Sequence, residues 1–144
     1  MEKIKSYIIL SKAKNALESI MKQNIESYGL TMNEFSVLEV LNTYERLMVN
    51  EIIQKVLIPN SSLTYVLERL ESKGYISRIQ CTSDKRAFYI SITTEGKSLM
   101  NEILPKHFKF IQNVYGVLSD NEVEELNRLL KKIGYHAEKF NDWR

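Results

Sequence analysis

Apolar side chains recur every three or four residues over three long stretches, which predicts three long helices. The stretches run over residues 3–28, from Thr93 to Val114 and from Ser119 to Phe140, and this spacing places the apolar residues on one face of a helix. Gly29 follows the first stretch as a stop signal. Two sequences with the Ser/Thr-x-x-Glu spacing of a capping box, Thr31–Glu34 and Ser119–Glu122, indicate where further helices begin.

Two shorter helical stretches lie in the middle of the chain. The first covers residues 49–56, Pro59 interrupts the pattern, and the second begins at Asn60 and ends at Gly74. Apolar residues of the second stretch occupy the i, i+3, i+4 and i+7 positions of one face: Leu63, Val66, Leu67 and Leu70. Two short helices joined by a short turn are typical of a helix-turn-helix.

The periodicity then changes from helical to alternating. Apolar and polar residues alternate over 76–81 and again over 88–93, and a polar turn at 82–86 separates the two runs. This pattern predicts a β-hairpin with a long loop that carries two adjacent positive charges, Lys85 and Arg86. The fold class is therefore mainly α with a small β-hairpin, in one domain over residues 1–144. The long terminal helices have more apolar surface than so small a chain can cover, so we expect a second copy to pack against them.

Composition excludes several classes of site. One cysteine, Cys81, and two histidines leave no disulfide framework and no thiolate or histidine metal cluster, so no cofactor is expected. No signal-peptide core and no membrane-length apolar run is present, which favours a cytoplasmic protein without a membrane partner. The net charge of +2 arises within residues 61–93, which hold five basic and three acidic residues. A local basic excess is typical of a small anion-binding module.

The outer face of the helix that begins at Asn60 is the first candidate site. Short hydroxyls and an aromatic ring near a helix N-terminus suit base edges and phosphates in a major groove, and the free amides at that end favour phosphate. The alternative is an ordinary solvated helix face. The candidate DNA contacts on this face are Ser61, Ser62, Thr64, Tyr65 and Arg69.

The tip of the hairpin is the second candidate site. Arg86 on an extended loop can reach a minor groove, with Asp84 orienting the loop or the arginine; the alternative is a polar turn with an incidental charge pair. Cys81 is either a thiol sensor near basic residues or a small half-buried hydrophobe. His107 lies on an apolar stripe and is either a packing residue or part of a small-molecule pocket. No nucleophile elbow, phosphate loop or His–Glu metal motif is present, so nothing favours an enzyme.

Four segments together resemble the MarR family (multiple antibiotic resistance regulator) of transcription factors. Ser61–Arg78 is similar to the family's recognition helix and first wing strand, and Asp84–Arg86 matches its Asp-x-Arg wing motif. Ile92–Lys97 matches the join from strand to helix, and Leu118–Glu122 resembles the entry to the last helix. The element order agrees over the whole chain, and Ser62–Val66 looks like the branch that answers quinones and phenols.

The resemblance implies a winged helix-turn-helix embedded in a helical dimerisation domain. Residues 30–93 would form the DNA-binding part, and residues 1–29 and 94–144 the dimerisation part. The protein would be a homodimer that binds a pseudo-palindromic, double-stranded DNA operator, usually as a repressor. By position, Ser61, Ser62, Thr64, Tyr65 and Arg69 would face the major groove. Arg78 would serve phosphate contact or wing support, and Asp84, Lys85 and Arg86 would form the wing tip.

The resemblance also implies an effector, because many members release DNA when a small phenolic or aromatic ligand, or an oxidant, acts on them. The expected pocket lies where the first, second and fifth helices meet the winged helix, near Tyr7, Phe35, His107 and Phe110. The alternative is a dry core with no inducer. A winged-helix adaptor without DNA binding competes with the regulator as a function, and Arg78, Lys85 and Arg86 argue against the adaptor because such a wing needs no positive charge.

Overall fold

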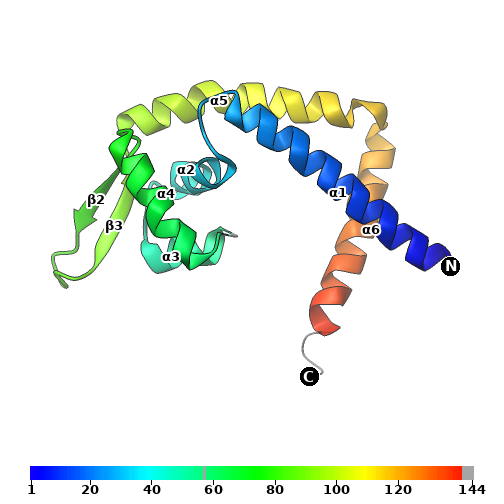
Figure 1. Cartoon of the computed structure of the whole chain (residues 1–144), viewed down its shortest axis with the longest axis horizontal. Coiled ribbons are helices and arrows are strands. Elements are labelled where there is room, and N and C mark those ends of the chain that lie inside the picture. The colour runs from blue at the N-terminus through cyan, green and yellow to red at the C-terminus, as the bar shows by residue number, and fades with distance from the viewer. Residues whose placement is uncertain (57, 141–144) are drawn as a thin grey trace. The chain divides into compact units, whose positions relative to one another are not determined.

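The structure is a computed structural model that describes residues 1–56 and 58–140 (Figure 1). It divides into two compact units, the first from Met1 to His107 and the second from Phe108 onward. The first unit contains α1 (Glu2–Glu26), α2 (Met32–Tyr44), β1 (Arg46–Met48), α3 (Val49–Lys55), α4 (Asn60–Ser72), β2 (Ile76–Gln80), β3 (Phe88–Ile92) and most of α5 (Thr94–Val114). The second contains the end of α5, the short 3-10 helix η1 (Tyr115–Val117) and α6 (Asp120–Lys139). The predicted mainly α fold with a β-hairpin is confirmed, while residues 141–144 of the predicted dimerisation part lie outside the described residues.

Both predicted capping boxes are present. At α2 the Thr31 hydroxyl accepts from the Glu34 amide at 3.1 Å, and Glu34 Oε1 accepts from the Thr31 amide at 3.0 Å. The same reciprocal pair joins Ser119 and Glu122 at α6, at 3.2 and 2.9 Å. These bonds satisfy amides that a helix start leaves without partners. The first helix ends at Glu26, two residues before the predicted end, because residues 27–29 form the turn that leads into α2.

The sheet has one strand more than the sequence pattern predicts. β1 pairs antiparallel with β3, and β3 pairs antiparallel with β2, so the strand order is β1-β3-β2. Leu47 of β1 lies opposite Ile90 of β3, and both side chains are buried. The prediction of a two-stranded hairpin alone was wrong in this respect, because a strand of three residues is too short to show alternation.

The hydrophobic core of the first unit holds α4 in place. All four residues of its predicted stripe, from Leu63 to Leu70, are buried. They belong to one cluster with apolar residues of α2, α3, the sheet and α5. Burial of such a side chain stabilises a fold by roughly 1.5–3 kcal/mol. The stripe therefore fixes which face of α4 is left to solvent, namely the polar one.

Most side chains of the outer turns of α1 and of α6 are exposed. Among the described residues, α1 has Ile25, near its C-terminal end, as its one buried residue, and α6 has none. Large apolar side chains stay exposed on both helices: Ile4, Tyr7, Ile8, Ile9 and Leu10 on α1, and Leu129, Leu130, Ile133 and Tyr135 on α6. Each helix thus carries apolar surface that a partner could cover. Within the part of the chain that the structure describes, no helix is both long and apolar enough to cross a membrane.

Replacement of Gly96 by alanine should destabilise the first unit. Gly96 lies in the first turn of α5, where an added methyl group would overlap the Tyr75 carbonyl oxygen and lie 2.8 Å from Ile92 Cγ1. Overpacking of this kind costs about 1–3 kcal/mol. Urea denaturation should show the loss for Gly96→Ala, whereas the control Ser98→Ala, at an exposed position of the same helix, should leave stability unchanged or raised by about 0.5 kcal/mol or less. Equal stability of the two variants would contradict the close approach of α5 to Tyr75.

Candidate nucleic-acid interface

The solvent face of α4 carries the residues that the sequence singled out. Ser61, Thr64, Tyr65 and Arg69 are exposed, and Ser62 is half-buried. The helix begins after Pro59, whose side chain cannot cap it, and this leaves the positive end of the helix open to an anion. Because the opposite face is buried, these side chains point away from the core together.

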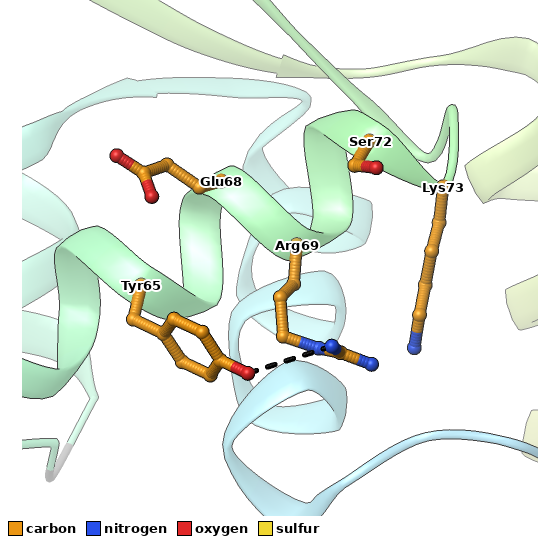
Figure 2. Close-up of a pocket in the computed structure, with 5 residues that line it drawn as sticks. All are labelled: Tyr65, Glu68, Arg69, Ser72 and Lys73. Carbon is orange, nitrogen blue, oxygen red and sulfur yellow. Dashed lines mark hydrogen bonds between the residues drawn. The ribbon is translucent and has the colours of Figure 1, made fainter.

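Tyr65 and Arg69 form a pair on this face, beside a shallow hollow that Glu68, Ser72 and Lys73 also line (Figure 2). Arg69 Nη1 donates to the Tyr65 hydroxyl at 3.4 Å, and the guanidinium lies 5.8 Å from the centre of the phenol ring. Figure 2 shows both side chains on one side of the helix, with Glu68 pointing away from them. The phenol thus steadies the guanidinium in a position where it can reach a base or a phosphate.

The hairpin of β2 and β3 extends away from the helices of the first unit (Figure 1), and its loop carries Arg86. The Arg86 side chain is 94% exposed, and its Nε lies 3.7 Å from Asp84 Oδ1. The same carboxylate oxygen accepts from the Arg86 amide at 3.0 Å, and Gln80 Nε2 donates to the Lys85 carbonyl at 2.6 Å. Asp84 therefore shapes the loop around Arg86, as expected, while the guanidinium stays open to a ligand.

Arg78 connects the wing to α4. Its Nε lies 3.5 Å from Glu71 Oε2, on the last turn of that helix. Of the two roles that the resemblance implied for Arg78, phosphate contact and wing support, this contact favours wing support. Cys81 is buried at the base of the loop, where its amide donates to the Ala87 carbonyl at 3.0 Å, and its burial favours the small-hydrophobe interpretation over the thiol sensor.

An ion pair between Glu34 and Lys73 was not predicted from the sequence. Lys73 Nζ lies 2.7 Å from Glu34 Oε2, and the Glu34 side chain is only 2% exposed. Burial alone would raise the pKa of Glu34, but the Lys73 ammonium and the bonds from Thr31 outweigh it and hold the pKa below the ordinary 4.5. The sequence marks Glu34 as a capping residue only, because nothing in it joins two residues 39 positions apart.

The structure brings together two of the four residues expected at an effector pocket. Phe35 and His107 make an edge-to-face contact with ring centres 5.1 Å apart. His107 Nδ1 also lies 2.9 Å from Asn24 Oδ1 on α1. Tyr7 lies on the same helix 17 residues before Asn24, or about 26 Å along the axis, and is exposed. Phe110 belongs to the second unit.

Comparison with known proteins finds transcriptional regulators among both the sequence relatives and the structural neighbours. The sequence profile of the SarA/Rot transcriptional regulators matches residues 19–103. The HTH-type transcriptional regulator MhqR of Bacillus subtilis is 34% identical over 139 residues, which covers 96% of each chain. The crystal structure of AbsC, a MarR family transcriptional regulator from Streptomyces coelicolor, matches with a TM-score of 0.81 at 23% identity over 93% of each chain. NadR in complex with 4-hydroxyphenylacetate matches with a TM-score of 0.68 at 25% identity over 88% of this chain and 89% of that one.

Acidification should weaken the first unit through His107. Burial lowers the pKa of His107 below the ordinary 6.5, and the nearby Glu39 carboxylate only partly opposes this. The neutral ring therefore contributes stability that is complete above pH 6.5 and is lost as the pH falls toward the lowered pKa. Urea denaturation at about pH 7.5 and about pH 5.5 should show a smaller loss for His107→Gln than for the wild type. The exposed His136→Gln should keep the wild-type difference, and a His107→Gln variant that also kept it would contradict the assignment.

Proposed function

We propose a mode of action for this chain, which belongs to the SarA/Rot family of MarR-like transcriptional regulators and is a DNA-binding regulator of transcription. It acts as a homodimeric repressor on a pseudo-palindromic operator, with α4 in the major groove and the hairpin tip at the flanking minor groove. A small phenolic or aromatic ligand releases it from the DNA. Because a regulator of transcription must reach DNA, we place the protein in the cytoplasm.

One observation carries the proposal: α4 buries an apolar face and exposes the opposite, polar face. The leucine stripe is buried, so the polar face has a fixed orientation toward solvent. We assign Tyr65 and Arg69 to base edges, because they form a pair on this exposed face and an arginine can bond a guanine through two hydrogen bonds. The hydroxyls of Ser61, Ser62 and Thr64 suit phosphates and bases near the helix N-terminus. A protein adaptor would not require this set together with an exposed arginine at the wing tip.

The hairpin supplies the second set of contacts. Arg86, held by Asp84 and almost fully exposed, suits the negative potential of a narrow minor groove. We assign Lys85 and Arg78 to the phosphates on either side of that groove, because both carry a positive charge on or beside the hairpin loop. Phosphate contacts fix the register of the protein on the duplex, and base contacts select the sequence.

Dimerisation is assigned to residues 1–29 and 94–144, and DNA binding to residues 30–93. A second copy of the chain is the partner that covers the exposed apolar residues of α1 and α6. A two-fold dimer presents two copies of α4, which is why the operator should be a pseudo-palindrome.

The effector is proposed to bind beside Phe35 and His107. An apolar ring, a histidine and the Asn24 amide supply the mixture of apolar surface and few polar anchors that a small aromatic ligand needs. NadR, which matches this fold, was crystallised with a hydroxyphenyl acid, and this favours the phenolic class. Phe110 remains a predicted contributor three residues after His107 on α5, and Tyr7 remains one that a second copy of the chain would have to bring to this pair.

The direct test of the proposal is binding to duplex DNA at several salt concentrations. The purified protein is mixed with the DNA upstream of its own coding region and with a random-sequence pool from which bound duplexes are enriched. The logarithm of affinity should fall with the logarithm of salt by about 0.9 for each phosphate neutralised. Absence of enrichment together with a flat salt response would favour the adaptor.

Arg86→Ala should weaken operator binding without affecting folding. The side chain pairs with Asp84 on an exposed loop, and loss of a groove contact costs about 1–3 kcal/mol. Arg128→Ala, which removes an equal charge from α6, is the matched control and should keep wild-type affinity in a gel-shift titration. An Arg86→Ala protein that binds as tightly as the control would reduce the wing tip to an ordinary turn.

Introduction of charge on the apolar face of α6 should break the dimer. Leu126→Glu with Leu130→Glu places two carboxylates on this face, and burial of unpaired charges at an interface is strongly unfavourable. Sedimentation should report monomers or insoluble protein. The control exchanges two charges on the opposite face, Glu124→Lys with Arg128→Glu, and should remain dimeric. A soluble Leu126/Leu130 variant that sediments as a dimer would contradict the assignment.

Phenolic acids should raise the melting temperature and release the enriched duplex. A ligand changes the DNA affinity only if it prefers the DNA-incompetent state, and a preference of about 1.4 kcal/mol per subunit shifts each subunit's contribution tenfold. His107→Gln should abolish the response, while His136→Gln should retain it. A panel of phenols, quinones and aromatic acids that changes neither the melting temperature nor the DNA binding would leave the dry-core alternative in place.

A further inference from the structure

The Glu34–Lys73 ion pair links the C-terminal end of α4 to the start of α2. Lys73 directly follows the last residue of α4, and Glu34 lies in the first turn of α2. Their 2.7 Å contact is made where the carboxylate is almost fully buried. The two residues are 39 positions apart, so the pair is a tertiary link between the recognition helix and its support.

Both carboxylate oxygens of Glu34 are committed, which gives the link a defined geometry. Oε1 accepts from the Thr31 amide at 3.0 Å, and Oε2 receives the Lys73 ammonium. The ammonium also donates to the Gly29 carbonyl at 3.4 Å, in the turn between α1 and α2. The capping box thus holds the carboxylate still, and the carboxylate holds Lys73.

The other contacts of α4 constrain its rotation less closely. Its N-cap residue is Pro59, which offers no side-chain cap, and its core contacts are apolar and non-directional. Its other ion pair, Glu71–Arg78, is longer at 3.5 Å, is partly exposed, and joins α4 to the hairpin and not to another helix. Arg69 lies one turn before Lys73, and both residues line the hollow on the DNA-facing side (Figure 2). A small roll of α4 about its axis would therefore move Tyr65 and Arg69 relative to the bases.

We propose that Glu34 and Lys73 are a positioning pair that sets the orientation of α4 on its operator, and that Lys73 acts through Glu34 and not as a phosphate contact. The proposal rests on the assignment of α4 as the recognition helix. The two cations that line the hollow therefore have different roles. Arg69 contacts DNA, and Lys73 binds the Glu34 carboxylate.

The variant Glu34→Gln distinguishes an electrostatic effect from a positioning role, because the two predict opposite changes in affinity for the selected DNA sequence. Glu34→Gln removes one negative charge per subunit and releases an ammonium beside the DNA-facing hollow. Electrostatics then favours tighter binding to any duplex. A positioning role predicts instead that binding to the selected sequence weakens while binding to scrambled DNA is kept or increased.

The experiment uses the full-length protein and two probes: a duplex enriched by the wild type from a random pool, and a scrambled duplex of the same composition. Glu34→Gln should bind the enriched duplex about tenfold more weakly, the cost of about one base contact, and the scrambled duplex as well as the wild type or better. The matched control is Glu122→Gln. Glu122 holds the equivalent position in the capping box of α6, and among the described residues it forms no ion pair with another helix. It should keep the wild-type ratio of the two affinities.

A second variant, Lys73→Gln, separates positioning from direct contact and serves equally if Glu34→Gln does not fold by circular dichroism. A positioning residue lowers the affinity ratio without changing the salt slope, whereas loss of a phosphate contact lowers the slope by about 0.9 for each contact. The proposal is overturned if Glu34→Gln binds both duplexes more tightly, or if Lys73→Gln shows the lower slope. A wild type that enriches no duplex would instead refute DNA recognition by α4 itself.

Discussion

The polar face of α4 depends on the burial of the opposite face of the same helix. The stripe from Leu63 to Leu70 packs into the same cluster as α2, the sheet and α5, so the helix cannot turn its polar face inward without exposing four apolar side chains. Removal of that much apolar surface from water is worth several kcal/mol, which is a large share of the stability of a small domain. The stripe determines which face of α4 points outward, and the directional Glu34–Lys73 pair sets the finer rotation of the helix within that limit.

The features that the sequence predicted are those that depend on near neighbours in the chain. The capping boxes at Thr31 and Ser119 are contacts over three residues, and Gly74 lies just after α4 with a φ of +82°. The stripe of α4 and the alternation of β2 and β3 arise from helical and strand periodicity, so the residues of the polar face and of the wing can be identified from the sequence alone. Asp84 orients Arg86 across two residues, which is again local.

The features that the sequence did not predict join distant segments. Arg46–Met48 is too short to show periodicity, and it forms a strand because it pairs with the free edge of β3. The Glu34–Lys73 pair depends on how α4 crosses α2, which no local pattern specifies. Phe35 and His107 of the expected pocket meet, whereas Tyr7 lies 17 residues before Asn24 on α1, because shared helical spacing does not say how far along α1 the second helix crosses. The pocket itself stays a prediction.

The central claim is that α4 occupies the major groove and the wing tip the minor groove, twice per dimer. Methylation protection by dimethyl sulfate on the enriched duplex tests it most directly, because guanine N7 reports the major groove and adenine N3 the minor groove. We expect two patches of protected guanines about one helical turn, or a multiple of it, apart, with protected adenines beside each patch that Arg86→Ala exposes again. Protection of the minor groove alone, or a single patch without two-fold symmetry, would contradict this account.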